Sequence, residues 1–332
     1  MPRVTPEPSP AALLALWDFD DPAGSELRFR RFVHQIPASP GTGLRAEALT
    51  QLARSQALQR KFRTAHRSLD RVPPLLRSGK SRARIRYFLE RGRVFNSSGD
   101  RTAARPLFRS AWGDARSLQE DGLAVDAGHM LALVESGARA AAWNARALDL
   151  AERSRQPAAR RWRASLENNI GWSRVERADY PGALRAFRAA LRYRRPQRVP
   201  KETRIATWCV AKTLRLMGRT REALRMQRTL LADWRRAKGK DGYVFEELGE
   251  CLHTLGRSDE ARAWFRLAYT ELSQDPWLVA NEGGRLDRLL RLSRGTTSIA
   301  TAGKAGSRPR IVRHRSRTKP RRRRRAGAGS RK

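Results

Sequence analysis

The apolar positions of residues 178–195 (ADYPGALRAFRAALRYRR) recur with the spacing of an α-helix. Ala183, Phe187 and Ala190 are related as i, i+4 and i+7, so they share one helix face. Alanine on such a face lets a second helix approach closely, and the aromatic ring fills the wedge where the two helices diverge. The preceding segment is also helical in pattern and carries Gly171, although a glycine costs a helix interior about 1 kcal/mol. We therefore predict an antiparallel helix pair with a close contact between its members.

The same face recurs along the chain. Phe108 and Phe265 each lie between two alanines at the same offsets, while other copies carry Leu69 or Gln227 at the aromatic position, and the weakest copy carries Arg146 there. The first alanines of the six copies lie 38 to 41 residues apart, and they are Ala65, Ala104, Ala142, Ala183, Ala223 and Ala261. A unit repeated at so constant a period indicates an array of stacked helix pairs.

The helices that precede these faces carry a second signature around a glycine. It reads "LERGRVF" at 89–95, "NNIGW" at 168–172 and "EELGECL" at 246–252. With these segments, residues 45–293 resemble the tetratricopeptide repeat (TPR) family, although the period near 39 is longer than is usual there and the closing proline is irregular. The resemblance implies an all-α, right-handed superhelix, an α-solenoid of about six helix-turn-helix repeats, whose concave groove holds a segment of a partner protein.

Four parts are expected along the chain. They are N-terminal capping helices, TPR-like repeats, a C-terminal capping helix and a disordered Arg-rich tail, at residues 1–43, 44–274, 275–294 and 295–332. Trp17 and Phe19 are expected to cover the open face of the first repeat, because a terminal repeat needs a cap. The tail has too few apolar side chains to offset its chain entropy. In the repeats and the C-terminal cap, helices are predicted near 44–59 and 62–76, 81–97 and 101–118, 121–136 and 139–154, 160–177 and 180–194, 202–217 and 220–237, 243–255 and 258–273, and 277–293.

The first helix of each pair is expected to line the concave surface. Its candidate partner-binding residues combine cations with asparagine and tryptophan, and they are Arg54, Arg93, Asn96, Asn169, Trp172, Trp208, Lys212 and Arg215, with Glu246 and Glu250 on the same surface. Arginine can hold a carboxylate with two hydrogen bonds, asparagine can bond a peptide backbone, and an indole can stack. We therefore expect a protein or peptide partner, with an acidic segment favoured. The alternative is that the tryptophans pack between repeats and the cations are ordinary solvated charges.

The net charge of +38 favours anionic partners. Residues 295–332 carry +14 of it, so the body is basic in its own right. A run of five arginines in the tail would bind phosphates without reading a base sequence, and these residues are Arg321, Arg322, Arg323, Arg324 and Arg325. The alternative function is therefore that of a sequence-nonspecific nucleic-acid-associated protein. An arginine-rich composition could also arise from a GC-rich genome without any selection for binding.

No motif in the sequence indicates catalysis. The five histidines lie far apart, and neither a P-loop, a nucleophile elbow nor a Cys or His pair at metal-ligand spacing is present. We expect a non-catalytic protein with no cofactor, no metal and no small-molecule substrate. Cys209 and Cys251 are predicted to be buried thiols, which fits a reducing compartment. No apolar run approaches the roughly 20 residues of a membrane span, so a cytoplasmic location is expected.

Overall fold

Helices form all the regular structure of the described residues. The computed structural model describes residues 9–37, 43–197 and 199–295. Six helix pairs follow one another in this part of the chain: α3 (Gly43–Leu58) with α4 (Phe62–Asp70), α5 (Arg82–Ser98) with α6 (Arg101–Ser117), α7 (Asp121–Val134) with α8 (Gly137–Arg153), α10 (Arg163–Val175) with α11 (Tyr180–Arg194), α12 (Pro200–Leu216) with α13 (Thr220–Arg236), and α14 (Gly242–Thr254) with α15 (Ser258–Leu272). The remaining elements are α1 (Pro10–Ala15), α2 (Pro22–His34), η1 (Pro73–Leu75), α9 (Pro157–Arg160), η2 (Arg195–Gln197), α16 (Pro276–Asn281) and α17 (Gly283–Arg294).

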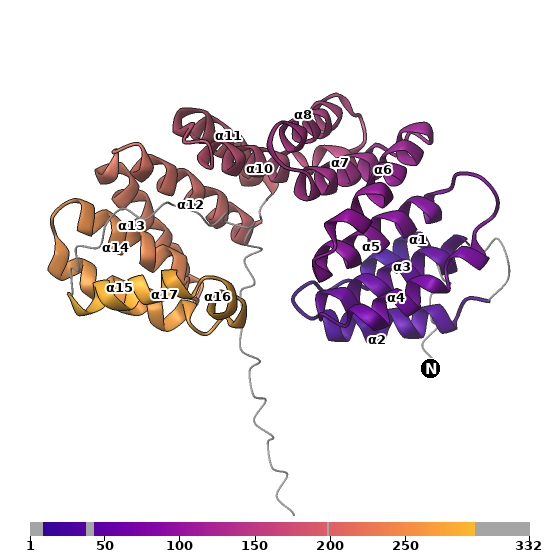
Figure 1. Cartoon of the computed structure of the whole chain (residues 1–332), viewed down its shortest axis with the longest axis horizontal. Coiled ribbons are helices and arrows are strands. Elements are labelled where there is room, and N and C mark those ends of the chain that lie inside the picture. The colour runs from indigo at the N-terminus through magenta and orange to yellow at the C-terminus, as the bar shows by residue number, and fades with distance from the viewer. Residues whose placement is uncertain (1–8, 38–42, 198, 296–332) are drawn as a thin grey trace, which may run out of the picture.

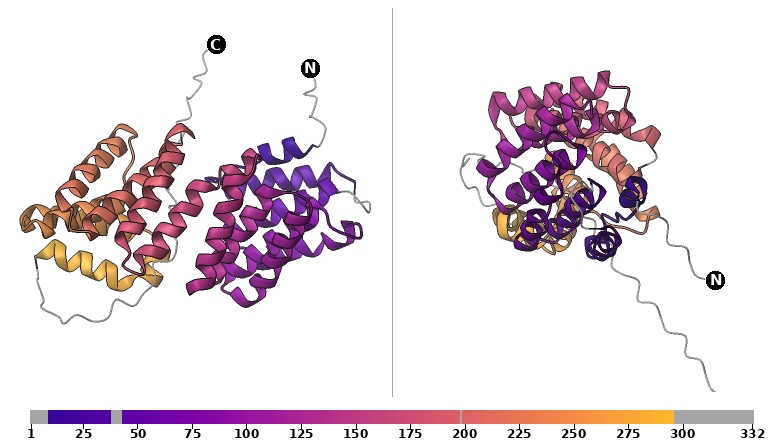
Figure 2. Two further views of the ribbon diagram at one scale, coloured as in Figure 1. Left: turned by 90° about the horizontal axis from the view of Figure 1, so that it is seen from above. Right: turned by 90° about the vertical axis from the view of Figure 1, so that its right-hand side faces the viewer.

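The pairs stack in chain order into an arch, with α8 and α11 on its outer side and α7 and α10 beneath them (Figure 1). The arch also winds, so that its two ends overlap when it is viewed along its long axis (Figure 2). The winding brings Asp20, between α1 and α2, to Lys201 at the start of α12, with Oδ1 3.2 Å from Nζ. This is the superhelix of stacked helix pairs that the repeat pattern predicted. Within the described ranges, none of the helices combines the length and the apolar character needed to cross a membrane.

Local signals in the sequence fix the helix boundaries. Asp179 caps α11, because its carboxylate accepts a hydrogen bond of 2.9 Å from the Gly182 amide, and Pro181 lies in the first turn, where it is tolerated. Gly99 ends α5 in the left-handed conformation with φ of +104°, which a residue with a side chain adopts only with strain. The turns within the helix pairs are therefore encoded by residues close to them in sequence.

The small–aromatic–small face is the contact between the two helices of a pair. Phe108, Phe187 and Phe265 are all buried, and each ring packs on a glycine of the preceding helix, at Gly92, Gly171 and Gly249 respectively. The flanking alanines are also buried, and they are Ala104, Ala111, Ala183, Ala190, Ala261 and Ala268. The sequence pattern therefore identified the core of three of the six pairs.

The register predicted for α8 is wrong by two residues. Ala142 is exposed, whereas Asn144 and Ala147 are buried, so the small residue of this copy is Ala140 and an asparagine takes the aromatic position. Several consecutive alanines at the start of α8 offered alternative registers. Packing decides between them, because Trp112 of α6 and Ala147 of α8 fill the space next to Gly128, the glycine of this pair.

The ends of the array depart from the prediction in detail. The helix predicted near 62–76 ends at Asp70, because two prolines follow and start the short η1 turn. The final helix predicted near 277–293 is two helices that meet at Glu282, where two consecutive glycines weaken the helix. Both ends still act as covers, since Trp17 donates a 2.9 Å hydrogen bond to Gln51 of the first repeat, while the last helices bury Leu278, Leu286 and Leu289. The residue limits of the four predicted parts stay predictions, and residues 296–332 lie outside the described residues.

Candidate functional site

A long, open groove lies between the two halves of the arch. Its volume is about 1140 Å³, and its lining comes from α3 to α8 on one side and from α10 and α12 to α16 on the other. Asn96 and Asn144 belong to the first side, and Trp172, Tyr243 and Trp277 to the second. Because the superhelix brings helices distant in sequence around one space, a single extended ligand could contact both halves.

Five of the eight predicted groove residues line this space. They are Arg54, Arg93, Asn96, Asn169 and Trp172. Lys212 and Arg215 lie on α12 outside the groove lining, and Trp208 is only 8% exposed, with its Nε1 donating a 3.1 Å hydrogen bond to the Tyr243 carbonyl. Trp208 therefore packs between repeats, which corrects the expected inward position. The role of all eight residues in partner binding stays a prediction.

The arginines of the N-terminal half are already bound to acidic side chains. Glu90 of α5 lies 2.5 Å from Arg93 and 3.1 Å from Arg54, measured between carboxylate oxygen and guanidinium nitrogen. Arg93 also pairs with Asp126 of α7. Burial acts to raise the pKa of the Asp126 carboxyl, but the positive charges of Arg93 and Arg54 hold it below its usual value. These pairs join α3, α5 and α7, so they hold three successive repeats in register.

An equivalent arrangement occurs in the C-terminal half. Glu247 of α14 is fully buried, and its two carboxylate oxygens lie 2.6 Å from Lys212 Nζ and 2.7 Å from Arg215 Nε. Burial opposes ionisation of Glu247, yet the two cations and their hydrogen bonds lower its pKa to about 2. The predicted acids on this surface are used in the same way, since Glu246 pairs with Arg285 and Glu250 with Arg288.

The predicted groove cations are therefore structural ion pairs between neighbouring repeats. Apart from the pair of Glu90 with Arg93 within α5, each acid lies 32 to 39 residues from its cation, which is close to one repeat. These pairs could be recognised only in the tertiary structure, where neighbouring repeats pack side by side. The pairing occupies the predicted groove cations, so they are not free to bind an acidic ligand.

Neutral polar groups are the better candidates for ligand contact. The Nδ2 atom of Asn169 lies 2.9 Å from the Nδ1 atom of His129. Asn96 is half-buried in the groove wall. Asn144 and Trp234 also line the groove, and sequence reasoning missed both. The Oδ1 atom of Asn144 and the Nε1 atom of Trp234 are buried without a hydrogen-bond partner among the described residues. An asparagine at an aromatic position of the repeat was the signal that could have identified Asn144.

No group of three or more His, Cys, Asp or Glu side chains in the part of the chain that the structure describes could hold a metal ion. Burial, which outweighs the nearby Lys212, raises the pKa of the Cys209 thiol to about 12, and burial together with Glu247 does the same for Cys251. Both thiols therefore stay protonated and unreactive at neutral pH, as expected for buried cysteines. The tail arginines Arg321, Arg322, Arg323, Arg324 and Arg325 lie outside the described residues.

Comparison with known proteins identifies the repeats. Residues 202–270, which run from the first turn of α12 to the last turn of α15, match the family model described as tetratricopeptide repeat. Among curated proteins, none matches the sequence of this chain.

Two solved structures with about the same fold share little sequence with this chain. A structure of NprR in complex with its cognate peptide NprX aligns over 87% of this chain and 82% of its own, with a TM-score of 0.55 and 16% identity. A structure of BtubC (BKLC) from P. vanneervenii aligns over 69% of this chain and 94% of its own, with a TM-score of 0.51 and 17% identity. At such identities the likeness concerns the fold alone.

Proposed function

Because the chain belongs to the tetratricopeptide repeat proteins, we propose that it is a non-catalytic scaffold that binds an extended segment of a partner protein in the groove between its two halves. The observation that carries this proposal is the groove of about 1140 Å³ with lining residues from both halves. The likeness to NprR, whose solved structure contains a bound peptide, supports a peptide ligand. A cytoplasmic location remains part of the proposal.

Hydrogen bonding and aromatic contact fit this groove better than charge attraction. Asn96, Asn144 and Asn169 are spread along the lining, and an asparagine amide can both donate to and accept from a peptide backbone. Trp172 and Trp277 offer partly buried indoles to apolar side chains of the ligand.

An acidic partner would have to compete with the acids already paired to the groove arginines, such as Glu90 and Asp126. An acidic character of the partner, which composition favoured, therefore gains no support from these contacts. We propose that an acidic segment binds no better than a neutral one of the same shape.

The test is a selection of peptides on the full protein, followed by binding measurements with two matched variants. Ser97 is exposed in the groove lining at the end of α5, and Ser110 is exposed on α6 outside it. Ser97→Trp places a bulky ring in the groove and is expected to abolish binding of the selected peptides. Ser110→Trp makes the same chemical change elsewhere and is expected to leave the affinity unchanged. A selection that yields no peptide, or peptides that bind both variants equally well, would exclude groove binding.

A second candidate function is sequence-independent association with nucleic acid. The net charge of +38 favours it, and the tail contributes only part of that charge. The specific observation in its favour is a set of exposed arginines on α11 and α13 that form no ion pair within the described residues.

A further inference from the structure

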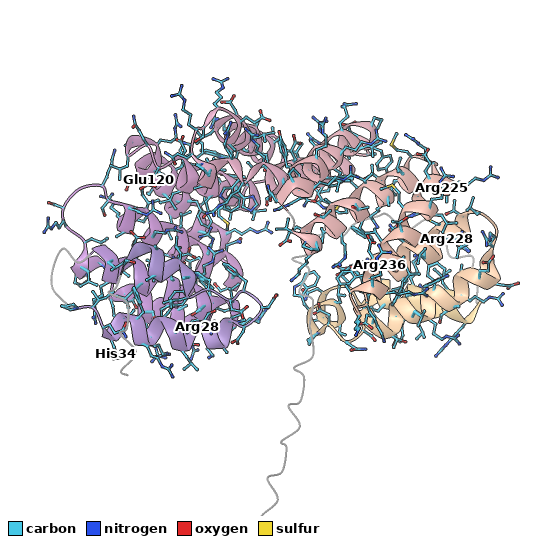
Figure 3. The ribbon with its side chains drawn as sticks, turned by 180° about the vertical axis from the view of Figure 1, so that it is seen from behind. Arg28, His34, Glu120, Arg225, Arg228 and Arg236 are labelled. Carbon is cyan, nitrogen blue, oxygen red and sulfur yellow. The ribbon has the colours of Figure 1, made fainter. Side chains whose placement is uncertain are left out.

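Two neighbouring outer helices carry arginines in stripes. Arg185, Arg188 and Arg192 of α11 are spaced as i, i+3 and i+7, so they share one face of that helix. The corresponding stripe on α13 consists of Arg221, Arg225 and Arg228, spaced as i, i+4 and i+7. All six side chains are exposed. Figure 3 shows Arg225 and Arg228 on the outer side of the C-terminal half.

None of these six arginines forms an ion pair with a residue that the structure describes. Helix α11 contains no acidic residue. The two acids of α13 are bound by other arginines, since Glu222 lies 2.7 Å from Arg219 and Asp233 pairs with Arg236. Within the described residues the six stripe arginines enter no ion pair, in contrast to the groove arginines.

The two stripes lie close enough to act on the same charge. The pKa of the Glu222 carboxyl is lowered first by its hydrogen bond from Arg219, and then also by the charges of Arg225 and Arg188. Arg188 belongs to α11 and Arg225 to α13, so one arginine of each stripe lies within electrostatic range of this carboxylate. On α15, the pKa of the Glu260 carboxyl is lowered first by its hydrogen bond from Arg257 and also by the charge of Arg228. Helices α11 and α13 both pack against α12, and we call their six stripe arginines together the arginine face.

The chemistry of the arginine face selects among anionic partners. Guanidinium groups bind phosphate oxygens with two hydrogen bonds, and a stripe of seven residues spans about 10 Å, along which a DNA duplex presents several phosphates. A membrane-binding surface normally adds apolar side chains that insert between lipids. The large exposed apolar side chains of the described residues are Leu14, Phe19, Leu27, Leu118, Leu267 and Val279, all outside α11 and α13.

We infer that the arginine face is a phosphate-binding surface that holds the backbone of nucleic acid without reading its sequence. This inference rests on the second candidate function and gives it a site. It is independent of the groove, because the six arginines lie outside the groove lining.

The experiment measures binding of the full chain to a short labelled duplex DNA by fluorescence anisotropy over a range of salt concentrations. The test variant combines Arg188→Ala, Arg225→Ala and Arg228→Ala. Because each neutralised phosphate adds about 0.9 to the slope of log K against log salt, the slope should become shallower by about 2.7. The matched control combines Arg63→Ala, Arg71→Ala and Arg77→Ala, which removes the same charge from exposed arginines in and after α4 and should leave the slope unchanged. Circular dichroism checks that each variant is folded, as alanine at these exposed positions should allow.

Four outcomes would overturn the inference, and they have different meanings. No binding of duplex or single-stranded DNA by the full chain would exclude the second candidate function itself. An equal loss of DNA affinity in both triple variants would mean that net charge alone sets the affinity. If the slope of log K against log salt in the test variant equals that of the wild type, and binding is lost when the five arginines of 321–325 become alanine, the contact lies in the tail. Tighter binding to vesicles that contain phosphatidylserine than to DNA would identify a membrane surface instead.

Discussion

The Phe187 ring lies directly on Gly171, so closely that a Cβ atom at residue 171 would lie 2.5 Å from the ring carbon Cε1. The same contact joins Phe108 to Gly92 and Phe265 to Gly249, in each case across 16 residues of sequence. The glycine is therefore what lets the first helix of a pair reach the aromatic ring of the second. Its helix-propensity cost is offset by this close packing.

We predict that Gly171→Ala lowers the free energy of unfolding by about 1–3 kcal/mol, because the added methyl group overpacks the contact with Phe187. Urea denaturation measures the change. Gly113 is the matched control, since it is an exposed helical glycine with no heavy atom near its Cβ position. Gly113→Ala should leave stability unchanged or raise it by up to about 1 kcal/mol. Equal effects of the two substitutions would contradict the packing role of Gly171.

Glu247 is predicted to matter for stability more than any exposed acid. Glu247→Gln leaves Lys212 and Arg215 facing a neutral amide, so we expect a loss of about 3 kcal/mol. This value is at the lower end for a broken buried pair, because the two cations remain 21% and 16% exposed. Chemical denaturation provides the measurement, with Glu222→Gln as the control. Glu222 pairs with Arg219 in solvent, so its loss should have little effect. If Glu222→Gln lost as much unfolding free energy as Glu247→Gln, the buried ion pairs of Glu247 would have no special role in stability.

The contribution of Glu247 should depend on pH in a defined direction. Folding lowers the pKa of this carboxyl from 4.5 to about 2, so the folded state favours its ionised form. The stabilisation is therefore complete above about pH 4.5 and is lost as the pH falls towards 2. Unfolding free energies of the wild type and Glu247→Gln, measured down this range, should converge at the acidic end. If the difference in unfolding free energy between the two proteins stayed constant with pH, the lowered pKa of Glu247 would be contradicted.

Gln227 is a buried amide that the fold leaves without partners. It occupies the aromatic position of α13, it is fully buried, and neither its Nε2 nor its Oε1 atom has a hydrogen bond in the described residues. We predict that Gln227→Leu raises the free energy of unfolding by about 1–3 kcal/mol, because it removes unsatisfied polar atoms at nearly constant volume. The midpoint of urea denaturation reports the change. Gln274→Leu, at an exposed glutamine, should bring no such gain, and destabilisation by Gln227→Leu would point to a bound water or ligand.

Most of the fold could be predicted from the sequence, but the candidate site could be predicted only in part. Asn96, Asn169 and Trp172 line the groove as expected from their place on the first helices. Asn144 could not be placed, because the alanines of α8 allowed more than one register and contacts with Trp112 and Gly128 selected the one observed. Trp208 was expected inside the groove, but the next repeat covers it.

The sequence by itself determined the helix pairs and their repetition. Spacings of four and seven residues, a capping aspartate such as Asp179 and a glycine such as Gly171 act over one or two helices, so their effect is readable along the chain. Only the tertiary structure decided which charges are free. Arg93 and Arg215 looked available for a partner until superhelical stacking brought Asp126 and Glu247 of the following repeats to them. An ion pair depends on distances in space, and the winding of the array sets those distances between residues one repeat apart.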